Sequence, residues 1–229
     1  MDIQNLYDNM INIKKDGFVK LNLNRWPRNR YEAALKFVSI KPDSKVLDVG
    51  FGQGDLLSYI STKTNFCYGL DISKKNLLYV KSLLPSKVNL SIQDVNSKTN
   101  FEDNFFDLIF LTDVFEHIID RYSVITELKR ILKKNGLLVI VTPNIAKIRS
   151  RIRLLFGNYP FTSEDRFSEN KKLIYDGGHI QWYTFESIFI LANQFNFKIN
   201  KSFGYGRFGK FHNIYPSLLS GSIAVIFKK

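Results

Sequence analysis

The amino-acid sequence predicts an α/β fold with a mostly parallel sheet and helices on both faces, and three observations support this. Short apolar runs alternate with helical patterns between residues 45 and 141. A glycine-rich turn joins the first run to the helix behind it, and acidic residues stand where several runs end. Strands separated by helices form parallel βαβ units, which bind ligands at the carboxyl ends of the strands. The acidic residues are therefore expected at the binding edge of the sheet.

The predicted elements follow one another in a regular order. Apolar runs with β-branched residues predict strands at 45–49, 66–70, 88–92, 106–111 and 137–141. Helical periodicity predicts helices at 31–40, 55–60, 73–84, 121–133 and 185–195, and Pro42 and Pro85 close two of them. Asn135-Gly136 is expected to turn the chain into the fifth strand. Thr184 is expected to cap the last helix.

The turn after the first strand carries glycines at positions 50, 52 and 54. Glycine lets the backbone approach a nucleotide where a Cβ atom would collide. The third glycine comes one residue too early for the dinucleotide fingerprint G-x-G-x-x-G. Asp48 and Asp55 would also repel a pyrophosphate, whereas a cofactor with an ammonium and a sulfonium group tolerates both acids. The alternative is a loop that merely turns sharply.

Acidic residues at the ends of the next two strands fit the same kind of cofactor. Asp71 lies about twenty residues beyond the glycine turn, where an acid can accept hydrogen bonds from both ribose hydroxyls. Asp94 and Val95 are expected beside the adenine, with the carboxylate accepting from the exocyclic amine. Read alone, Asp71 could instead cap the helix that begins near Ser73, and Asp94 could belong to an ordinary loop.

Residues 45–144 resemble the small-molecule type of class I S-adenosylmethionine-dependent methyltransferases. The motifs that carry the resemblance are, in order, V-L-D-V-G-F-G-Q-G, Y-G-L-D-I-S, Q-D-V, F-D-L-I-F-L-T-D-V-F-E-H-I and L-K-K-N-G-L-L-V-I-V-T-P-N. The resemblance implies a Rossmann-like, seven-stranded sheet ordered 3-2-1-4-5-7-6 with the last strand antiparallel. Segments 197–203 and 222–228 fit strands six and seven. Phe51 departs from the family, which often has a small residue there; this should leave the cofactor fold intact.

The resemblance also implies S-adenosyl-L-methionine as the cofactor. Asp48 and the glycines would shape the amino-acid end of its site, Asp71 the ribose and Asp94 the adenine. No metal site is expected. The full set of expected cofactor-binding residues is Asp48, Gly50, Gly52, Gly54, Asp71, Ile72, Asp94, Val95 and Thr112.

The sequence after the fourth predicted strand limits the chemical classes of methyl acceptor that the protein is expected to use. Residues 112–115 read T-D-V-F and lack the prolines of enzymes that methylate exocyclic amines of DNA bases. Carbon-5 base methylation needs a cysteine nucleophile at this edge, and Cys67 falls inside the second strand instead. Glu116-His117 is similar to the E-H of quinone-, sugar- and lipid-modifying relatives, in which the histidine more often braces the loop. These features favour a hydroxyl acceptor on a small molecule, a sugar or a lipid-linked compound.

His179 is the expected catalytic base. It follows two glycines in a segment that resembles the G-x-H…F stretch of ubiquinone-biosynthesis-type and sugar-modifying O-methyltransferases. Histidine titrates near neutral pH, and the glycines could let it swing toward the cofactor's methyl group. The alternative is a histidine that hydrogen-bonds the start of the following helix.

Composition bounds the class of protein. The 229 residues suffice for one elaborated domain, with 45% hydrophobic content typical of an ordered globule. The formal charge of +12 leaves RNA methylation open, although scattered lysines favour solvated faces over a nucleic-acid footprint. A module that binds the cofactor without catalysis also remains open. The lone Cys67 excludes a disulfide framework and a cysteine-based zinc site, and no signal peptide is apparent, so a cytoplasmic protein is expected.

Two segments stand outside this core. Residues 1–30 are interpreted as an N-terminal arm or lid, or as a docking segment without a chemical role, and 31–229 as the methyltransferase domain. Residues 145–178 are interpreted as an insertion that begins with a basic amphipathic helix at 145–156 and continues as a lid. The helix is expected to lie on the inner face of an anionic membrane, to grip a phosphorylated substrate or to pack on the domain. The aromatic loop 204–221, with His212, could floor the substrate pocket or pack between strands.

Overall fold

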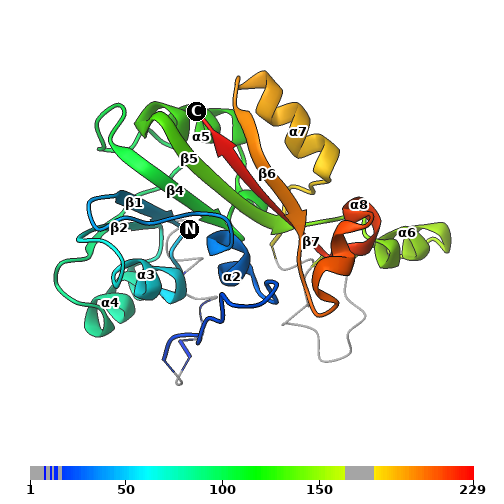
Figure 1. Ribbon diagram of the computed structural model, residues 1–229, viewed down its shortest axis with the longest axis horizontal. Coiled ribbons are helices and arrows are strands. Elements are labelled where there is room, and N and C mark those ends of the chain that lie inside the picture. Colours follow the sequence, from blue (N-terminus) through cyan, green and yellow to red (C-terminus); the bar gives the residue numbers. More distant parts are fainter. Residues whose placement is uncertain (1–7, 9–10, 12, 15–16, 163–177) are drawn as a thin grey trace.

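A computed structural model describes residues 8, 11, 13–14, 17–162 and 178–229 of the chain. The strands form one seven-stranded sheet in the order β3-β2-β1-β4-β5-β7-β6, with helices on both faces (Figure 1). β7 runs antiparallel to both of its neighbours, β5 and β6, whereas the pairs formed among β1 to β5 are parallel. The predicted strand order and the antiparallel last strand are confirmed.

The elements have the following bounds. The strands are β1 Lys45–Val49, β2 Phe66–Asp71, β3 Asn89–Ile92, β4 Phe106–Thr112, β5 Leu132–Pro143, β6 Lys198–Gly204 and β7 Ser222–Lys228. The helices are α2 Arg30–Leu35, α3 Asp55–Ile60, α4 Lys74–Leu83, α5 Arg121–Ile131, α6 Ile148–Leu155, α7 Phe185–Gln194 and α8 Pro216–Leu219. Short 3₁₀ turns cover Phe115–His117 and Gly209–Asn213.

Two predicted elements have an end that differs from the structure by more than three residues. Helix α2 ends at Leu35 instead of continuing to Ile40, and segment 38–40 is not helical. β5 begins at Leu132, because Leu132 already pairs with Phe106 of β4. The register shifts before Leu137, and the predicted turn residue Asn135, with φ of 65°, lies within this irregular stretch. Asn135 therefore lies inside β5, where the pairing with β4 is irregular, and does not precede the strand as predicted.

The core consists of two apolar layers on opposite faces of the sheet. Neighbouring residues of a strand point to opposite faces, so Leu47 of β1 joins one layer and Val46 joins the other. Side chains of α5 and α7 complete the first layer, and side chains of α2, α3 and α4 complete the second. Thr184 caps α7 as predicted, in a reciprocal pair of hydrogen bonds with Ser187. This packing fixes the carboxyl ends of β1, β2, β4 and β5 at one edge.

The described part of the N-terminal arm contacts this edge. The indole Nε1 of Trp26 donates to the carbonyl oxygen of Gly204 over 3.1 Å, and its ring packs edge-on against Phe203. Closer to the glycine turn, Lys14 forms an ion pair with Asp55, and the backbone amide of Val19 donates to the same carboxylate over 2.8 Å. Trp26 thus anchors the arm to β6, and the residues before it reach α3.

Candidate active site

The glycine turn between β1 and α3 is shaped by close neighbours on one side and open space on the other. Gly50 has φ of +68°, and a Cβ atom on it would lie 2.3 Å from Cγ2 of Val114. Its amide donates to the carbonyl of Leu70 over 2.6 Å, which ties the turn to β2. Gly52 has φ of +52° and nothing within 4 Å of a Cβ position. The backbone at Gly52 is therefore open on the side where a Cβ atom would stand.

Asp71, the last residue of β2, holds the turn from the other side. One carboxylate oxygen accepts from the amide of Gly52 over 2.7 Å, and the other accepts from the amide of Ser73 over 2.8 Å. Ser73 itself caps α4, because its hydroxyl accepts from the amide of Asn76 over 3.0 Å. The capping role considered for Asp71 therefore belongs to Ser73. Asp71 instead joins the end of β2 to the glycine turn.

Three carboxylates gather around this turn. Burial raises the pKa of Asp48 well above its usual value, and the nearby charges of Asp71 and Asp55 raise it further. Burial also raises the pKa of Asp71, although its hydrogen bonds to backbone amides oppose the shift. Like charges in a buried site make a cationic ligand favourable, since it relieves their repulsion. The site is thus suited to an ammonium or sulfonium group.

The remaining expected cofactor residues lie along the same edge. The amide of Gln93 donates to the carbonyl of Asp71 over 3.1 Å, which brings the end of β3 and the following Asp94 beside β2. One oxygen of Asp94 accepts from both amide groups of Asn96, at 2.9 and 2.7 Å, as in an ordinary loop. Val95 is buried in the core. Thr112 ends β4, and its buried hydroxyl has no hydrogen-bond partner among the described residues. Ile72 follows directly behind β2 and is half-buried.

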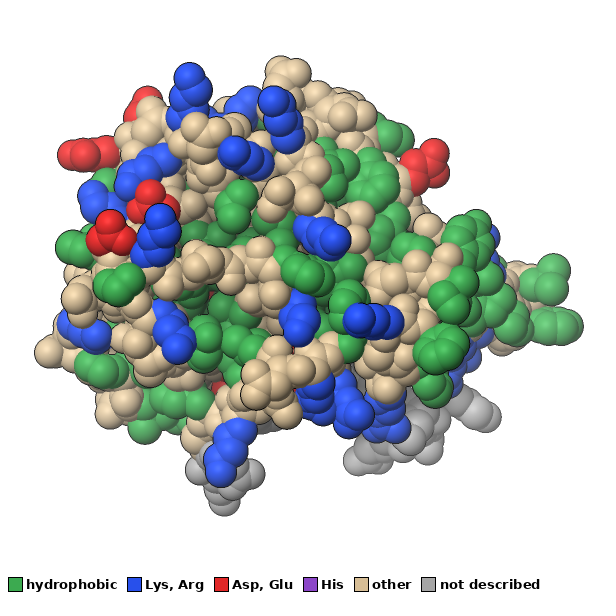
Figure 2. All heavy atoms as spheres, viewed as in Figure 1, with side chains coloured by type: hydrophobic (Ala, Val, Ile, Leu, Met, Phe, Trp, Pro, Cys, Tyr) green, Lys and Arg blue, Asp and Glu red, His purple; other side chains and the backbone are tan. Residues whose placement is uncertain are grey.

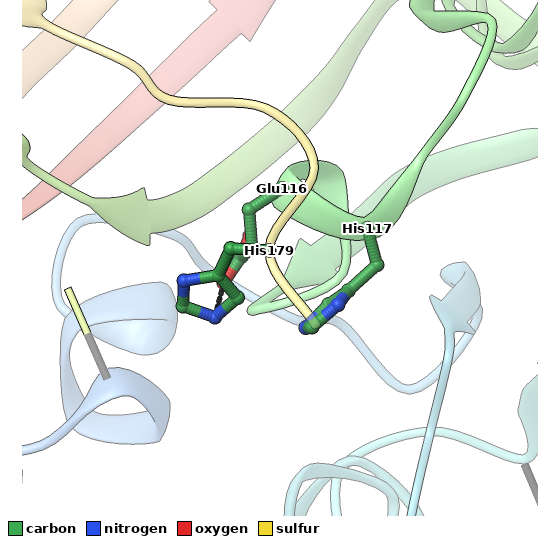
Figure 3. A group of neighbouring side chains, drawn as sticks. All are labelled: Glu116, His117 and His179. Atoms are coloured by element: carbon green, nitrogen blue, oxygen red, sulfur yellow. Dashed lines mark ion pairs between the residues drawn. The ribbon is translucent and has the colours of Figure 1, made fainter. Parts of the chain in front are cut away.

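A second group of candidate site residues is built around the turn that follows β4 in the chain. Glu116 and His117 come from the 3₁₀ turn Phe115–His117, and His179 comes from the segment before α7 (Figure 3). Nε2 of His179 lies 3.9 Å from Oε1 of Glu116, and the two histidine rings lie edge-to-face with centroids 4.9 Å apart. The three residues can each offer a metal-ligand atom, and these atoms lie within 4.8 Å of one another. The structure therefore brings His179 to a partner that the sequence did not identify.

Hydrogen bonds orient the three side chains. Nδ1 of His117 lies 3.1 Å from the carbonyl oxygen of Gly178. A carbonyl only accepts, so this nitrogen carries the proton and Nε2 of a neutral His117 keeps a lone pair. Nδ1 of His179 lies 2.6 Å from the hydroxyl of Thr162. These contacts fix the ring positions from outside the cluster, as the partners of metal-binding or catalytic histidines do.

Glu116 is the most perturbed member of the cluster. It is 1% exposed, and burial raises its pKa to about 8, assisted by the charge of Asp113. Its Oε2 accepts from the hydroxyl of Thr142 over 3.0 Å, whereas Oε1 is buried without a hydrogen-bond partner among the described residues. Strongly perturbed carboxyl groups concentrate at functional sites. The sequence signal for Glu116 was the E-H pair, but only the fold places it against His179.

Two further residues at this edge were not expected. Asp113 has φ of +51°, which is uncommon for a residue other than glycine, and it forms an ion pair with Arg30 of α2. Arg30 was expected only as part of a closing arm. The other histidine considered at the sequence level, His212, is buried, with Nδ1 2.8 Å from the carbonyl oxygen of Leu219. His212 therefore braces its own loop.

Comparisons with known proteins show what this chain is similar to in sequence and in fold. Residues 47–140 match the family described as a methyltransferase domain. A probable tocopherol O-methyltransferase of Oryza sativa subsp. japonica is 30% identical over 122 residues, which cover 48% of this chain and 33% of that protein. A ubiquinone biosynthesis O-methyltransferase of Glaesserella parasuis is 27% identical over 173 residues, which cover 69% and 73%. The crystal structure of a SAM-dependent methyltransferase from Aquifex aeolicus is similar with a TM-score of 0.56 at 19% identity, covering 86% and 88%.

Fold and glycine turn together define a Rossmann-like cofactor-binding protein. With the family match over residues 47–140 and the motif order, this part of the chain is a methyltransferase domain of the class I S-adenosylmethionine-dependent type. Other matches carry the names of N- and C-methyltransferases, so relatives at similar identity differ in the atom that they methylate. The chain spans about a third of the length of the two plant relatives that it matches.

S-adenosyl-L-methionine is the cofactor of this family, and the residues at the edge fit it. The open backbone at Gly52 leaves room where a Cβ atom would stand. The buried carboxylates Asp48 and Asp71 complement its cationic groups. Asp71 is held by backbone amides at the end of β2, the position from which an acid binds a ribose in folds of this type.

Proposed function

We propose that the chain transfers the methyl group of S-adenosyl-L-methionine to a hydroxyl group of a small-molecule, sugar or lipid-linked acceptor. The observation that carries this proposal is the pairing of His179 with buried Glu116, Nε2 to Oε1 at 3.9 Å, on the edge where the glycine turn lies. An alcohol or phenol holds its proton at neutral pH, so attack on the methyl group gains from a base within hydrogen-bond reach. His179 is the proposed base.

Each residue has a defined part in this mechanism. The bound cofactor supplies a methyl group that its sulfonium already activates. Gly52, Asp48 and Asp71 bind and orient the cofactor so that donor and acceptor align for in-line displacement. As the acceptor oxygen attacks, its proton moves to Nε2 of His179. Glu116 beside it stabilises the imidazolium in its ionised form, which predominates above a pH of about 8 because the pKa of Glu116 is raised. Thr162 and Thr142 hold the two side chains in place through the hydrogen bonds described above.

Cofactor binding is the first test. Isothermal titration calorimetry of the purified chain should detect binding of S-adenosyl-L-methionine and of its demethylated product, but no binding of NAD. The variant Asp71→Ala should bind the cofactor at least about tenfold more weakly, because it loses the acid at the end of β2. Asp43→Ala is the control, since Asp43 is an exposed acid away from the edge. Binding of NAD in place of the cofactor would end the proposal.

The second test concerns the base. A cell extract supplies unidentified acceptors, and methyl transfer is followed with methyl-labelled cofactor and by release of the demethylated product. His179→Ala should lower turnover by about a hundredfold or more, with cofactor affinity unchanged within about twofold. Full turnover in that variant would show that another group takes the proton or that alignment alone suffices.

A divalent cation is the second candidate for activating the acceptor, and the same cluster favours it. Glu116, His117 and His179 each offer a metal-ligand atom within 4.8 Å of the others, and Glu116 presents a buried oxygen without a hydrogen-bond partner among the described residues. A cation held by Glu116, His117 and His179 would lower the pKa of a bound hydroxyl directly. Chelator-treated protein distinguishes the roles: the base mechanism keeps its turnover, whereas the metal mechanism loses it until Mg²⁺, Mn²⁺ or Zn²⁺ is returned.

Two other functions make different predictions. A module that only binds the cofactor would release no demethylated product in any extract. An RNA methyltransferase would bind RNA with a steep salt dependence. The net charge of +12 is the feature of the sequence that favours RNA.

A further inference from the structure

One end of the molecule exposes large apolar side chains on two separate segments. In and just after α6, Leu155 is 79% and Phe156 is 74% exposed. In the loop before α8, Phe208 is 76% and Phe211 is 71% exposed. Among the residues of α6, Ser150 is the buried one, so the apolar face of this helix does not pack on the described part of the domain. Contiguous exposed apolar surface of this kind marks an interaction site.

The same two segments are purely cationic. Segment 145–162 carries one lysine and three arginines, segment 204–221 carries one of each, and neither contains an aspartate or a glutamate. Arg149 and Arg151 of α6 and Arg207 and Lys210 of the loop are exposed. We call residues 145–156 and 207–219 together the basic apolar surface. Its chemistry combines apolar side chains that avoid water with charges of one sign.

The two segments are held side by side. Nδ2 of Asn144, directly before segment 145–156, donates to the carbonyl oxygens of Ser217 and Ser220 at 3.1 and 2.8 Å. Figure 1 places α6 and α8 next to each other at one end of the sheet, and Figure 2 shows hydrophobic side chains projecting there beside lysine and arginine side chains. Among the residues that the structure describes, no helix is long and apolar enough to cross a bilayer. Contact with a membrane at this end would therefore be peripheral.

We propose that the basic apolar surface docks on an anionic lipid bilayer. A short amphipathic helix with arginines beside its apolar face lies in the interface of a bilayer, with apolar groups among the acyl chains and cations at the head groups. Each lysine or arginine near an anionic membrane adds attraction. The absence of acids from both described segments gives a charge complement to anionic lipid and leaves no negative group to pair with a second copy of the same surface.

The surface adjoins the candidate active site. The amide of Ile145, the first residue of the surface, donates to the carbonyl of Tyr183 over 3.0 Å, and the Tyr183 hydroxyl donates to the carbonyl of Phe115 over 3.4 Å, next to Glu116. Docking would therefore bring the site edge toward the head groups, where a lipid-linked acceptor is found. The docking itself rests on surface chemistry and does not depend on the proposed methyl transfer.

Vesicle co-sedimentation tests the proposal. The full chain is mixed at low salt with vesicles of phosphatidylcholine containing phosphatidylglycerol, and in parallel with pure phosphatidylcholine. Binding to the anionic vesicles should be at least about tenfold stronger and should weaken with added salt. The charge reversal Arg149→Glu with Arg207→Glu should reduce binding about tenfold or more. Leu155→Ser with Phe208→Ser should reduce it through the apolar contact.

Matched controls exclude general effects of charge and hydrophobicity. Lys81→Glu with Lys98→Glu reverses two exposed charges near the opposite edge of the sheet, and Leu78→Ser removes an exposed leucine from α4. Both variants should bind vesicles like the unaltered chain, and circular dichroism should confirm folding of all four variants. Failure of the unaltered chain to bind anionic vesicles, or equal losses in the controls, would overturn the proposal. A dimer that Leu155→Ser with Phe208→Ser dissociates, without vesicle binding, would assign the surface to a second copy instead.

Discussion

At Gly50 two requirements for glycine coincide. The backbone has φ of +68°, and a Cβ atom would lie 2.3 Å from Cγ2 of Val114 in the loop after β4. Gly157 has the same φ of +68° but nothing within 4 Å of a Cβ position. The two glycines therefore separate the cost of the left-handed backbone from the cost of the collision.

We predict that Gly50→Ala destabilises the chain by more than Gly157→Ala. The left-handed backbone should cost about 1–2 kcal/mol at either position. The contact with Val114 should add about 1–3 kcal/mol at Gly50 alone, as overpacking does elsewhere. Urea unfolding of both variants measures the difference. Adding Val114→Ala to Gly50→Ala should recover part of the lost stability. Equal destabilisation at the two glycines would contradict the prediction that the contact with Val114 adds to the cost at Gly50.

At the residue scale, the sequence predicted that the glycine turn and Asp71 lie together at the sheet edge, but it did not predict that Glu116 lies against His179. The glycines and Asp71 follow one another in a pattern that a strand, a turn and a helix impose locally. The contact between Glu116 and His179 joins two loops that are distant in the sequence, so it cannot be predicted from the spacing of the residues. His179 was predicted as a candidate from the glycines before it, whereas its neighbour Glu116 became apparent only in the structure.

The strands, too, were predicted correctly where a local pattern sets their bounds and incorrectly where a long-range pairing sets them. β1, with two valines and four buried residues among its five, has the bounds that its pattern predicted. β5 starts earlier than predicted because Leu132 pairs across to Phe106, a contact that local periodicity does not contain. The amphipathic pattern of 145–156 predicted a helix, but the same pattern suits packing on a domain and binding at a surface. The exposure of Leu155 and Phe156 shows that these two side chains do not pack on the described part of the domain.

Asn144 connects the end of β5 to the elements beyond the sheet. Its side chain is fully buried, its amide nitrogen donates to two carbonyls of the α8 region, and its oxygen accepts from the amide of Ala146 over 3.0 Å. Asn144→Ala should therefore leave buried backbone groups unpaired and destabilise the chain by about 2–4 kcal/mol. Thermal or urea unfolding measures this loss. Asn158→Ala, which removes an exposed asparagine with one local hydrogen bond, should change stability by less than about 0.5 kcal/mol.

On the scale of the whole molecule, buried acids reduce stability in a chain that is otherwise strongly cationic. A carboxyl group whose pKa is raised by folding binds its proton more tightly in the folded state than in the unfolded state. Stability then falls as the pH rises from the unfolded pKa, about 4, through the higher folded pKa. Asp48 and Asp71 both belong to this class. The cationic cofactor would reverse this penalty when it binds.

Asp48→Asn should accordingly be more stable than the unaltered chain without ligand at pH 7–8, and its advantage should shrink toward about pH 4–5. Urea midpoints across this pH range measure the effect. Asp43→Asn removes an exposed acid and should leave the pH dependence unchanged. Asp48→Asn should at the same time bind S-adenosyl-L-methionine more weakly. A constant difference in stability at every pH would mean that Asp48 is not the titrating group.

The position of β7 has a consequence for folding of the protein. β7 follows β6 in the chain, yet it lies between β5 and β6 in the sheet and pairs with both. As long as residues 222–228 have not joined the sheet, β5 and β6 both present unpaired edges. Exposed strand edges recruit other chains. Partly folded molecules that lack β7 should therefore be the species most prone to aggregation.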